Sequence, residues 1–357
     1  MKVAIIGSGN AGCAHACMFT EAGHNVNLIK TSYSLHDENF EKAKSQGGLY
    51  YEYNNETKFA HLNLITRDLS EGLDDIDIVV IMTQTLHHKN ISLRIKEYIS
   101  KSVKLILVIP GYLGSLYFKD FKDIIVAEGE STPFDARIIT PGKVQILFKN
   151  IRNAIGVYPL TKSKYALDLC RELTPTYHSV RTNIIESALH NPNLVVHTIG
   201  AIMSASRIEY SKGEFWMYKE AFTPSIWNLI DSLDKEKNLV IEAFGGKASP
   251  YLEECKFRNE SDMTVNAKDA FTMYANEGGP KGPSIVNSRY VYEDVPMGLV
   301  LLESLGKSKK IETPVTSALI NIASALLNTN FRLDGRTVNC LKLDVNNNDL
   351  INKICGI

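Results

Sequence analysis

The chain has 357 residues, and 39 Lys and Arg against 40 Asp and Glu give it a formal net charge of −1. This length suits about two domains, and 44% of hydrophobic residues can fill a sizeable core. The balanced charge argues against a nucleic-acid partner, and no stretch reaches the roughly 20 apolar residues of a membrane-spanning helix. Cys13 and Cys17 lack the spacing of a common zinc motif, so we expect no metal site. Scattered cysteines are typical of buried thiols, which predicts a cytoplasmic protein.

The first thirty residues have the pattern strand, glycine turn, helix, strand. An apolar run, Val3–Ile6, leads into the turn and a helical stretch, and a second strand follows at 25–30. The turn is G-x-G-x-x-G in a context that supports a dinucleotide site, and its residues are Gly7, Ser8, Gly9, Asn10, Ala11 and Gly12. In such turns the first glycine allows a tight bend, the second lets the backbone approach a pyrophosphate, and the third lets the helix pack on the strand. Backbone N–H groups at the helix start then hold the phosphates, so these residues predict a dinucleotide-binding domain.

The end of the second strand indicates which dinucleotide binds. NAD sites usually have Asp or Glu there to hold the ribose 2′-hydroxyl, whereas this chain has Lys30, Thr31 and Ser32. One cation and two hydroxyl groups would receive a 2′-phosphate, which a carboxylate would repel. We therefore favour NADP(H) over NAD(H) as the cofactor. The alternative is that Lys30 is a solvated lysine and that Asp37 holds the ribose from the following loop.

The rest of the first half alternates strand and helix patterns, as in a doubly wound, mostly parallel sheet. We expect a helix at 86–101 and strands at 62–66, 76–83, 103–109, 124–127, 137–139 and 154–157. Two loops, 83–85 and 110–115, follow carboxyl ends of expected strands, where ligands of such sheets bind. We therefore expect further cofactor contacts from Thr83, Gln84, Pro110 and Gly111, although ordinary turns would have the same residue types.

From about residue 180 the pattern changes to long helices. Asn191 and Pro192 are typical of an N-cap and a first helical residue, and that helix should continue to about residue 209. Further helices are expected at 224–244 and at 314–327, with a loop over 276–283.

The predicted fold is therefore an α/β Rossmann domain followed by an all-helical domain. We place the NAD(P)-binding domain at 1–180 and the helical domain, with the substrate and catalytic residues, at 181–357. The cleft between two such domains is the default position of an active site.

A reductase of carbonyl or imine groups needs a proton donor, and histidine is the usual one because its pKa lies near neutrality. Of the nine histidines, His190 and His197 are the ones outside the cofactor domain and the polar connections. His197 would share a helix face with the small residues Gly200, Ala201 and Ser204, which would let another element approach closely. The alternative for His197 is a buried core histidine.

A second candidate segment, 288–296, follows a loop rich in glycine and proline. Arg289 could bind a carboxylate through two parallel hydrogen bonds. Asp294 could hold a histidine in one tautomer and stabilise its charged form. The alternative is a surface pair of Arg289 with a glutamate, followed by a helix start. The chemistry requires this segment to meet His197 in space, which the sequence alone does not decide.

Several segments together resemble the octopine/nopaline (opine) dehydrogenase family. They are, in chain order, the glycine turn at 7–12, then 191–197, 204–210, 215–220, 223–225 and 233–237, and finally Arg289-Tyr290 with 293–296. The likeness spans essentially the whole chain in the same order, so it is more specific than the glycine turn alone. It implies a helical domain like the C-terminal domain of 6-phosphogluconate dehydrogenase.

The resemblance implies an enzyme that joins the amino group of an amino acid to the carbonyl carbon of a 2-oxo acid such as pyruvate. NAD(P)H then reduces the imine. The resemblance also implies His197 and Asp294 as a catalytic pair and Arg289 as the substrate-binding arginine. Two positions depart from the family pattern: Thr198 stands where a proline often follows the histidine, and Lys30 replaces the usual acid, which argues against NADH.

Two other functions are compatible with the sequence. One is a simple reductase of 2-oxo acids, or its reverse on hydroxy acids, of the ketopantoate reductase or glycerol-3-phosphate dehydrogenase type. Such enzymes often use a lysine, and Lys281 is the clearest candidate. The other is a dinucleotide-sensing protein without turnover. The sequence leaves open the identity of both substrates, the product stereochemistry, the direction in the cell, and whether the protein forms a homodimer.

Overall fold

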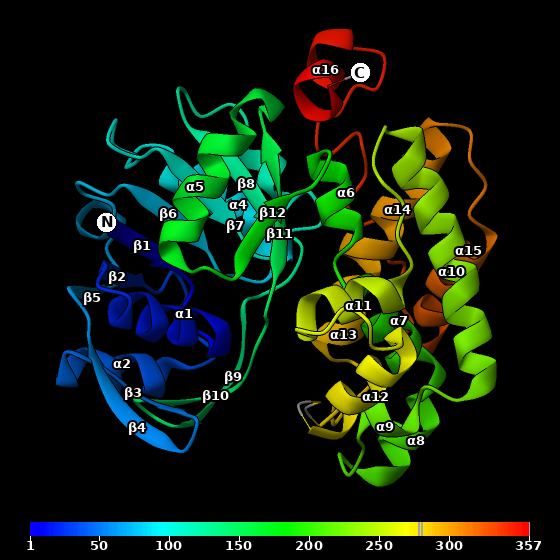
Figure 1. Cartoon of the computed structure of the whole chain (residues 1–357), viewed down its shortest axis with the longest axis horizontal. Coiled ribbons are helices and arrows are strands. Elements are labelled where there is room, and N and C mark those ends of the chain that lie inside the picture. The colour runs from blue at the N-terminus through cyan, green and yellow to red at the C-terminus, as the bar shows by residue number, and fades with distance from the viewer. Residues whose placement is uncertain (278, 280, 357) are drawn as a thin grey trace. The chain divides into compact units, whose positions relative to one another are not determined.

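The structure is a computed structural model that describes residues 1–277, 279 and 281–356. The chain divides into two compact units, Met1–Val180 and Arg181–Ile357, and each is described by itself. In Figure 1 the first unit runs from blue to green and the second from green to red. Helices account for every element of the second unit in the described residues, whereas the first unit is built on sheets.

An eight-stranded sheet forms the centre of the first unit (Figure 1). Its strands are β1 (Lys2–Ile6), β2 (Asn25–Ile29), β5 (Leu64–Thr66), β6 (Ile78–Ile81), β7 (Leu105–Val108), β8 (Ile125–Gly129), β11 (Asn153–Tyr158) and β12 (Tyr177–Val180). The first six of these are parallel and lie in the order β5-β2-β1-β6-β7-β8. Counted along the chain, this is the 3-2-1-4-5-6 order of doubly wound dinucleotide-binding sheets. β11 extends the sheet antiparallel to β8, and β12 follows it.

Apolar residues alternate between two cores on the two faces of this sheet. Val3 and Ile5 enter the core that contains the apolar side of α1, whereas Ala4 and Ile6 enter the core that contains α4. The helices of the unit are α1 (Asn10–Glu21), α2 (Asp37–Gln46), α3 (Leu69–Gly72), α4 (His88–Ile95) and α5 (Ser163–Leu173). Because both faces are covered, the central strands are apolar throughout, which is why the sequence identified them.

A separate four-stranded sheet packs on α1 (Figure 1). Its strands are β3 (Gly48–Tyr53), β4 (Glu56–His61), β9 (Phe134–Thr140) and β10 (Lys143–Lys149), in the order β4-β3-β10-β9. The expected strand at 137–139 exists, but it belongs to this sheet rather than to the parallel one. We did not expect β3, β4 and β10, because half-exposed strands with many polar residues give a weak signal.

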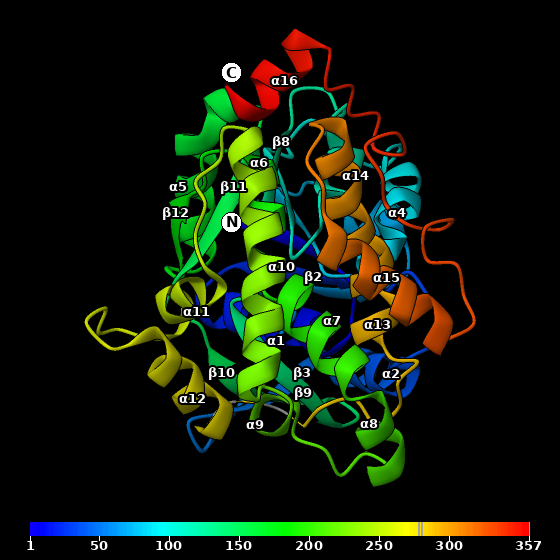
Figure 2. The same cartoon turned by 90° about the vertical axis from the view of Figure 1, so that its right-hand side faces the viewer.

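The second unit is organised around the long helix α10 (Pro224–Ala243), which begins with a proline at its first turn. The elements α6 (Ile184–Leu189), α7 (Asn193–Met203), α14 (Val300–Ser308) and α15 (Pro314–Leu326) all pack against it (Figure 2). The remaining helices are α8 (Ala205–Ser211), α9 (Met217–Glu220), α11 (Tyr251–Asn259), α12 (Ala267–Glu277), α13 (Arg289–Tyr292) and α16 (Asn348–Cys355). Across the described residues, no helix combines the length and apolar character that crossing a membrane requires.

Three expectations about this unit need correction. The single helix expected to reach residue 209 is two helices, because α7 ends at Met203 and α8 starts at Ala205. Pro192 rather than Asn191 occupies the cap position, although Asn191 Oδ1 still accepts the Asn193 N–H at 3.1 Å. The loop expected over 276–283 starts later than predicted, since α12 continues to residue 277, and residues 278 and 280 lie outside the described residues.

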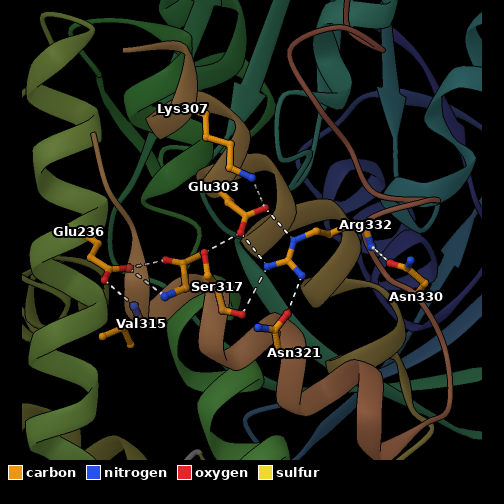
Figure 3. A network of polar contacts seen from close by, with 9 residues as sticks. Glu236, Glu303, Lys307, Val315, Ser317, Asn321, Asn330 and Arg332 are labelled. Atoms are coloured by element: carbon orange, nitrogen blue, oxygen red, sulfur yellow. Dashed lines mark hydrogen bonds and ion pairs between the residues drawn. The ribbon is translucent and has the colours of Figure 1, made fainter. Parts of the chain in front are cut away.

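A buried carboxylate on α14 accepts hydrogen bonds from three side chains of the second unit. Glu303 accepts hydrogen bonds from Arg332 Nε at 2.9 Å, from Ser317 Oγ at 2.6 Å and from Lys307 Nζ at 3.1 Å (Figure 3). The hydrogen bond from Arg332 is the largest cause that lowers the pKa of Glu303 from 4.5 to about 2. The ionised Glu303 therefore ties α14 to α15 and to the segment that carries Arg332.

A second buried carboxylate joins α10 to the start of α15. Glu236 accepts the backbone N–H groups of Val315 at 2.6 Å and Thr316 at 2.9 Å (Figure 3). The first N–H groups of a helix have no partner within the helix, and a negative charge there is favourable. Glu236 thus satisfies the first turn of α15 and fixes that helix on α10.

We expect Glu303→Gln to destabilise the second unit in a pH-dependent way. Because its pKa is lower in the folded chain than the ordinary 4.5, its contribution is complete above about pH 4.5 and is lost as the pH falls toward 2. Loss of the charged hydrogen bonds should lower the free energy of unfolding by about 2 kcal/mol at pH 7. Both tryptophans, Trp216 and Trp227, lie in this unit, so denaturant unfolding followed by tryptophan fluorescence measures the change.

The control for this prediction is Lys307→Gln, which removes the exposed partner of the same carboxylate. The Lys307 side chain is 69% exposed, so its loss should change the free energy of unfolding by no more than about 0.5 kcal/mol. Equal losses in both variants, or a Glu303→Gln effect that persists undiminished at pH 2, would contradict the assigned role.

Candidate active site

The glycine turn between β1 and α1 is shaped partly by the protein's own packing. Gly7 has a φ of +123°, and a Cβ on it would lie 2.6 Å from the Met82 backbone oxygen. A Cβ on Gly12 would overlap the carbonyl oxygen of Gly7. Gly9 differs, because a Cβ there would meet the His36 side chain only at 3.7 Å, an ordinary contact. The fold thus requires glycine at positions 7 and 12, where a side chain would collide with the backbone. At position 9 the packing does not require glycine, so the close approach of a bound group is the physical reason for its presence there.

One hydroxyl group in this turn and one beside it are buried. Ser8 Oγ and Thr83 Oγ1 lack a hydrogen-bond partner among the described residues, and Thr83 comes soon after β6, the strand beside β1. Buried polar groups normally have a partner, so these two fit a bound group with acceptor oxygens. Asn10 faces elsewhere, since its Oδ1 accepts the Ile138 N–H of β9 at 2.8 Å. Asn10 and Ala11 could therefore meet phosphates through their backbone N–H groups alone.

The loop over 110–115 is built around a carboxylate that the sequence did not single out. Glu128 on β8 is fully buried and accepts the N–H groups of Leu113 at 2.8 Å and Ser115 at 3.2 Å. Leu113 has a positive φ of 60°, and the preceding Tyr112 has a φ of 48°. Such strained residues persist where surrounding contacts fix them, so Glu128 determines the shape of this loop.

The two predicted cofactor loops are joined to each other. Thr85 Oγ1 donates a hydrogen bond to the Gly111 carbonyl oxygen at 2.6 Å. Thr83 and Gln84 precede this contact, and Pro110 precedes Gly111. These four predicted residues therefore lie together at the carboxyl ends of β6 and β7, the edge at which doubly wound sheets bind ligands.

Lys30 is buried at the end of β2, and its ammonium group already has partners. Its Nζ lies 3.1 Å from Ser32 Oγ, 2.8 Å from the Leu35 carbonyl oxygen and 3.4 Å from Asp37 Oδ1. Asp37 also pairs with Arg67 at 2.9 Å, and the hydrogen bond from Arg67, followed by that from Lys30, holds the pKa of Asp37 below its usual value. Lys30, predicted to bind a 2′-phosphate, and Asp37, the alternative residue that would hold the ribose, are thus in contact with each other.

Two arginines that sequence reasoning missed lie at the same place. Arg67 follows β5, and its guanidinium stacks on the rings of Tyr33 at 4.3 Å and Phe40 at 4.5 Å. Arg94 donates to the Thr31 carbonyl oxygen at 3.1 Å. Arg67 could have been found from the sequence, since it follows the strand beside β2 at the ligand-binding edge.

His197 and Asp294 are 97 residues apart in the sequence and in direct contact. His197 Nδ1 lies 2.8 Å from Asp294 Oδ2, and these residues are 8% and 1% exposed. Because a carboxylate accepts hydrogen bonds, this contact places a proton on Nδ1 and leaves Nε2 as the nitrogen that can exchange a proton with a substrate. Asp294 also starts a π-helical turn, Val295–Leu299, that leads into α14. Such turns are frequent at functional sites.

Gly200, one of the small residues expected on the face of His197, lets another element approach closely. A Cβ on Gly200 would lie 2.7 Å from Met217 Sδ, so this face of α7 receives α9. His197 meets Asp294 because α13 packs directly on α7 (Figure 2).

Arg289 lies on the same short helix that approaches His197. Its side chain is 51% exposed, and its Nε lies 3.3 Å from Oε2 of the buried Glu293. The next residue, Tyr290, stacks on the imidazole of His197 with ring centroids 3.8 Å apart and 10° between the planes. Arg289 therefore pairs with Glu293 and directly precedes the residue that stacks on His197. The sequence had given no role to Tyr290.

The other candidates have structural partners. Burial is the largest cause that lowers the pKa of His190 well below its ordinary value, and the nearby Lys237 and Arg181 lower it further. A histidine kept neutral in this way cannot shuttle protons near pH 7. Lys281 pairs with Glu214 at 2.7 Å and lies 4.9 Å from the centre of the Trp216 ring.

Residues 180–327 match the family described as NAD/NADP octopine/nopaline dehydrogenase, alpha-helical domain, and residues 2–133 match the NAD-dependent glycerol-3-phosphate dehydrogenase N-terminus. The opine dehydrogenase of Arthrobacter sp. (strain 1C) is 30% identical over 355 residues, which cover 95% of this chain and 94% of that protein. The structure of octopine dehydrogenase in complex with NADH and agmatine has a TM-score of 0.77 at 16% identity, over 100% of this chain and 98% of that one. NADP+-bound yersinopine dehydrogenase has a TM-score of 0.74 at 12% identity, with the same coverage. These two structures show that the fold is shared.

Proposed function

Because this chain belongs to the opine dehydrogenase family, we propose that His197, Asp294 and Arg289 perform its reaction. The protein is an NAD(P)-dependent oxidoreductase that condenses an amino acid with a 2-oxo acid and reduces the product, and catalyses the reverse. The observation that carries our assignment of residues is the 2.8 Å contact between His197 Nδ1 and Asp294 Oδ2. We take a 2-oxo acid such as pyruvate as the carbonyl substrate.

In this proposal His197 moves protons during condensation. The amino group must lose a proton as it attacks the carbonyl carbon, and Nε2 of the neutral imidazole accepts that proton. His197 then returns this proton to the alkoxide oxygen of the adduct, which gives the carbinolamine. A second transfer through Nε2, from the nitrogen to the hydroxyl group, releases water and leaves the imine. Asp294 keeps the imidazole in the tautomer that has its lone pair on Nε2 and stabilises the charged ring between the two steps.

Arg289 would bind the carboxylate of the 2-oxo acid. A guanidinium group matches a carboxylate through two parallel hydrogen bonds. Arg289 pairs through Nε with Glu293, and the next residue along the helix, Tyr290, stacks on His197. A fixed cation at this place would orient the oxo acid and polarise the carbon under attack.

The residues of the first unit fit a dinucleotide. Gly9 is open to close approach, and Ser8 and Thr83 present buried hydroxyl groups without a partner among the described residues. When bound, the reduced nicotinamide supplies the hydride that reduces the imine. We propose that Gly7–Gly12 and the loops that begin at Thr83 and Pro110 form this site.

We further propose a preference for NADP(H). Lys30 and Arg67 both pair with Asp37, and Lys30 also donates to Ser32, so the Asp37 carboxylate stands in for the anion that the two cations would otherwise bind. A 2′-phosphate would replace the carboxylate as their partner. Buried free thiols at Cys13, Cys17, Cys170, Cys255 and Cys355 suit a reducing compartment, and we place the protein in the cytoplasm.

The experiment that tests the reaction is oxidation of NADPH and NADH at 340 nm with pyruvate, in parallel with and without a pool of amino acids. Oxidation that requires both substrates supports the proposed condensation, and dividing the pool identifies the amine. Oxidation with the oxo acid alone would instead indicate a simple reductase. Cofactor binding without turnover in any well would indicate a sensor.

Replacement of His197 by Asn should lower kcat by roughly 10² to 10⁴-fold, the usual contribution of general acid–base catalysis. The affinity for NADPH, measured by fluorescence titration, should stay within about twofold because the dinucleotide residues lie in the other unit. His190→Asn is the matched control and should keep its kcat within about threefold. Near-natural turnover in His197→Asn would refute its role.

Replacement of Lys30 by Met should lower the ratio of kcat/KM for NADPH over NADH by about tenfold, the effect of losing one charged contact worth roughly 1.4 kcal/mol. Asp37→Asn should raise the ratio, because it removes the competing anion. Lys58→Met, an exposed lysine of the same unit, is the control. If Asp37→Asn instead lowers kcat/KM for NADH selectively, Asp37 holds the ribose hydroxyls and our preference is wrong.

A further inference from the structure

We propose that Tyr290 is a positioning residue for His197: its ring fixes the plane of the imidazole and stabilises the charge that the imidazole carries after it accepts a proton. This inference rests on the proposed proton-transfer role of His197. It starts from the face-to-face stacking of the two rings, with centroids 3.8 Å apart and planes 10° apart.

The stacking restricts the orientation of the imidazole. The hydrogen bond from Nδ1 to Asp294 places one edge of the ring. Stacking on Tyr290 opposes a tilt of the ring about that edge, since any tilt separates the two ring faces. Together the two contacts determine where Nε2 points, which a proton-transfer group requires.

The face of the Tyr290 ring also favours a positive charge on the imidazole. The face of an aromatic ring carries negative charge density and attracts a cation with roughly 0.5–2 kcal/mol. A neutral imidazole gains less from that face than a protonated one. A rate changes only when a contact stabilises one of these two states more than the other. The stacking should therefore favour the stage of the reaction in which His197 is protonated.

The chain fixes the position of Tyr290. Tyr290 lies on α13 between Arg289 and Val291, and Val291 is fully buried. Tyr292, on the same helix, is 49% exposed, which makes it a suitable control. Three consecutive side chains of α13 thus have separate contacts: Arg289 with Glu293, Tyr290 with the imidazole, and Val291 with the core.

The test compares Tyr290→Leu, Tyr290→Phe and the matched control Tyr292→Leu from the same helix. Tyr290→Leu should lower kcat of the reductive reaction by about two- to thirtyfold, the range that corresponds to the loss of the cation–ring attraction. KM for pyruvate and the affinity for NADPH should stay within twofold. Tyr290→Phe should restore kcat to within about twofold of the natural chain, because the ring face acts and the hydroxyl group does not. Tyr292→Leu should leave kcat unchanged.

A double-mutant cycle separates this inference from the proposed function. If Tyr290 acts through His197, Tyr290→Leu should cause no further loss of kcat in the His197→Asn background. An equal loss in both backgrounds would overturn the positioning role and leave the role of His197 intact. A His197→Asn variant with natural turnover would overturn the proposed function itself.

A spectroscopic readout does not depend on turnover. In protein labelled at histidine, the signal that His197→Asn removes identifies the carbon-bound protons of His197. Stacking shifts these protons upfield through the ring current of Tyr290, so they should move downfield in Tyr290→Leu and stay in place in Tyr290→Phe and Tyr292→Leu. If Tyr290→Leu does not fold, incorporating pentafluorinated phenylalanine at position 290 keeps the shape and reverses the charge of the ring face. A fluorinated variant with the kcat of Tyr290→Phe would overturn the electrostatic part of the proposal.

Discussion

The contact between His197 and Asp294 is the interaction on which the proposed chemistry of the second unit depends. It joins α7 to a segment 97 residues later, and both partners are nearly inaccessible to solvent. A buried carboxylate is costly unless it is paired, and the contact with His197 offsets part of the cost of burying Asp294. The π-helical turn after Asp294 is in turn fixed by the Arg336 N–H, which donates to the Pro296 carbonyl oxygen at 2.9 Å. Further along the same run, Glu303 and Arg332 anchor α14 (Figure 3).

In the first unit, some residues of the predicted cofactor site are required by the fold itself, and others are explained only by a bound ligand. Gly7 and Gly12 are required by backbone atoms of the protein itself, whereas Gly9 meets no such obstacle. Ser8 and Thr83 hold buried hydroxyl groups that nothing in the described residues satisfies. Lys30 shows the opposite case, since its partners within the chain are already in place. The cofactor preference therefore depends on competition between Asp37 and a 2′-phosphate, which the residue type of Lys30 alone did not reveal.

The sequence was most informative where a single physical requirement dominates. Strands covered on both faces are continuously apolar, so the parallel sheet was recognisable, whereas β3, β4 and β10 mix polar and apolar residues and were missed. His197 and Asp294 could be named as candidates from their chemistry, but their meeting depends on how α13 packs on α7, which no local pattern encodes. Tyr290 belonged to a segment that resembles the family, but nothing in the sequence gave it a role, because an aromatic residue beside an arginine is compatible with any surface helix. Glu128 was missed because its partners are backbone N–H groups of a loop whose strained shape the sequence does not show.

The most direct test of this account is the turnover of Asp294→Asn. Asparagine keeps the shape of the side chain but loses its charge and can present a donor to Nδ1, so the imidazole would take the wrong tautomer. The account predicts a fall in kcat on the order of 10² to 10⁴-fold with pyruvate and the amine, while NADPH affinity and the melting temperature remain close to those of the natural chain. An Asp294→Asn protein that folds, binds NADPH and turns over at the natural rate would contradict the claim that this carboxylate sets the chemistry of His197.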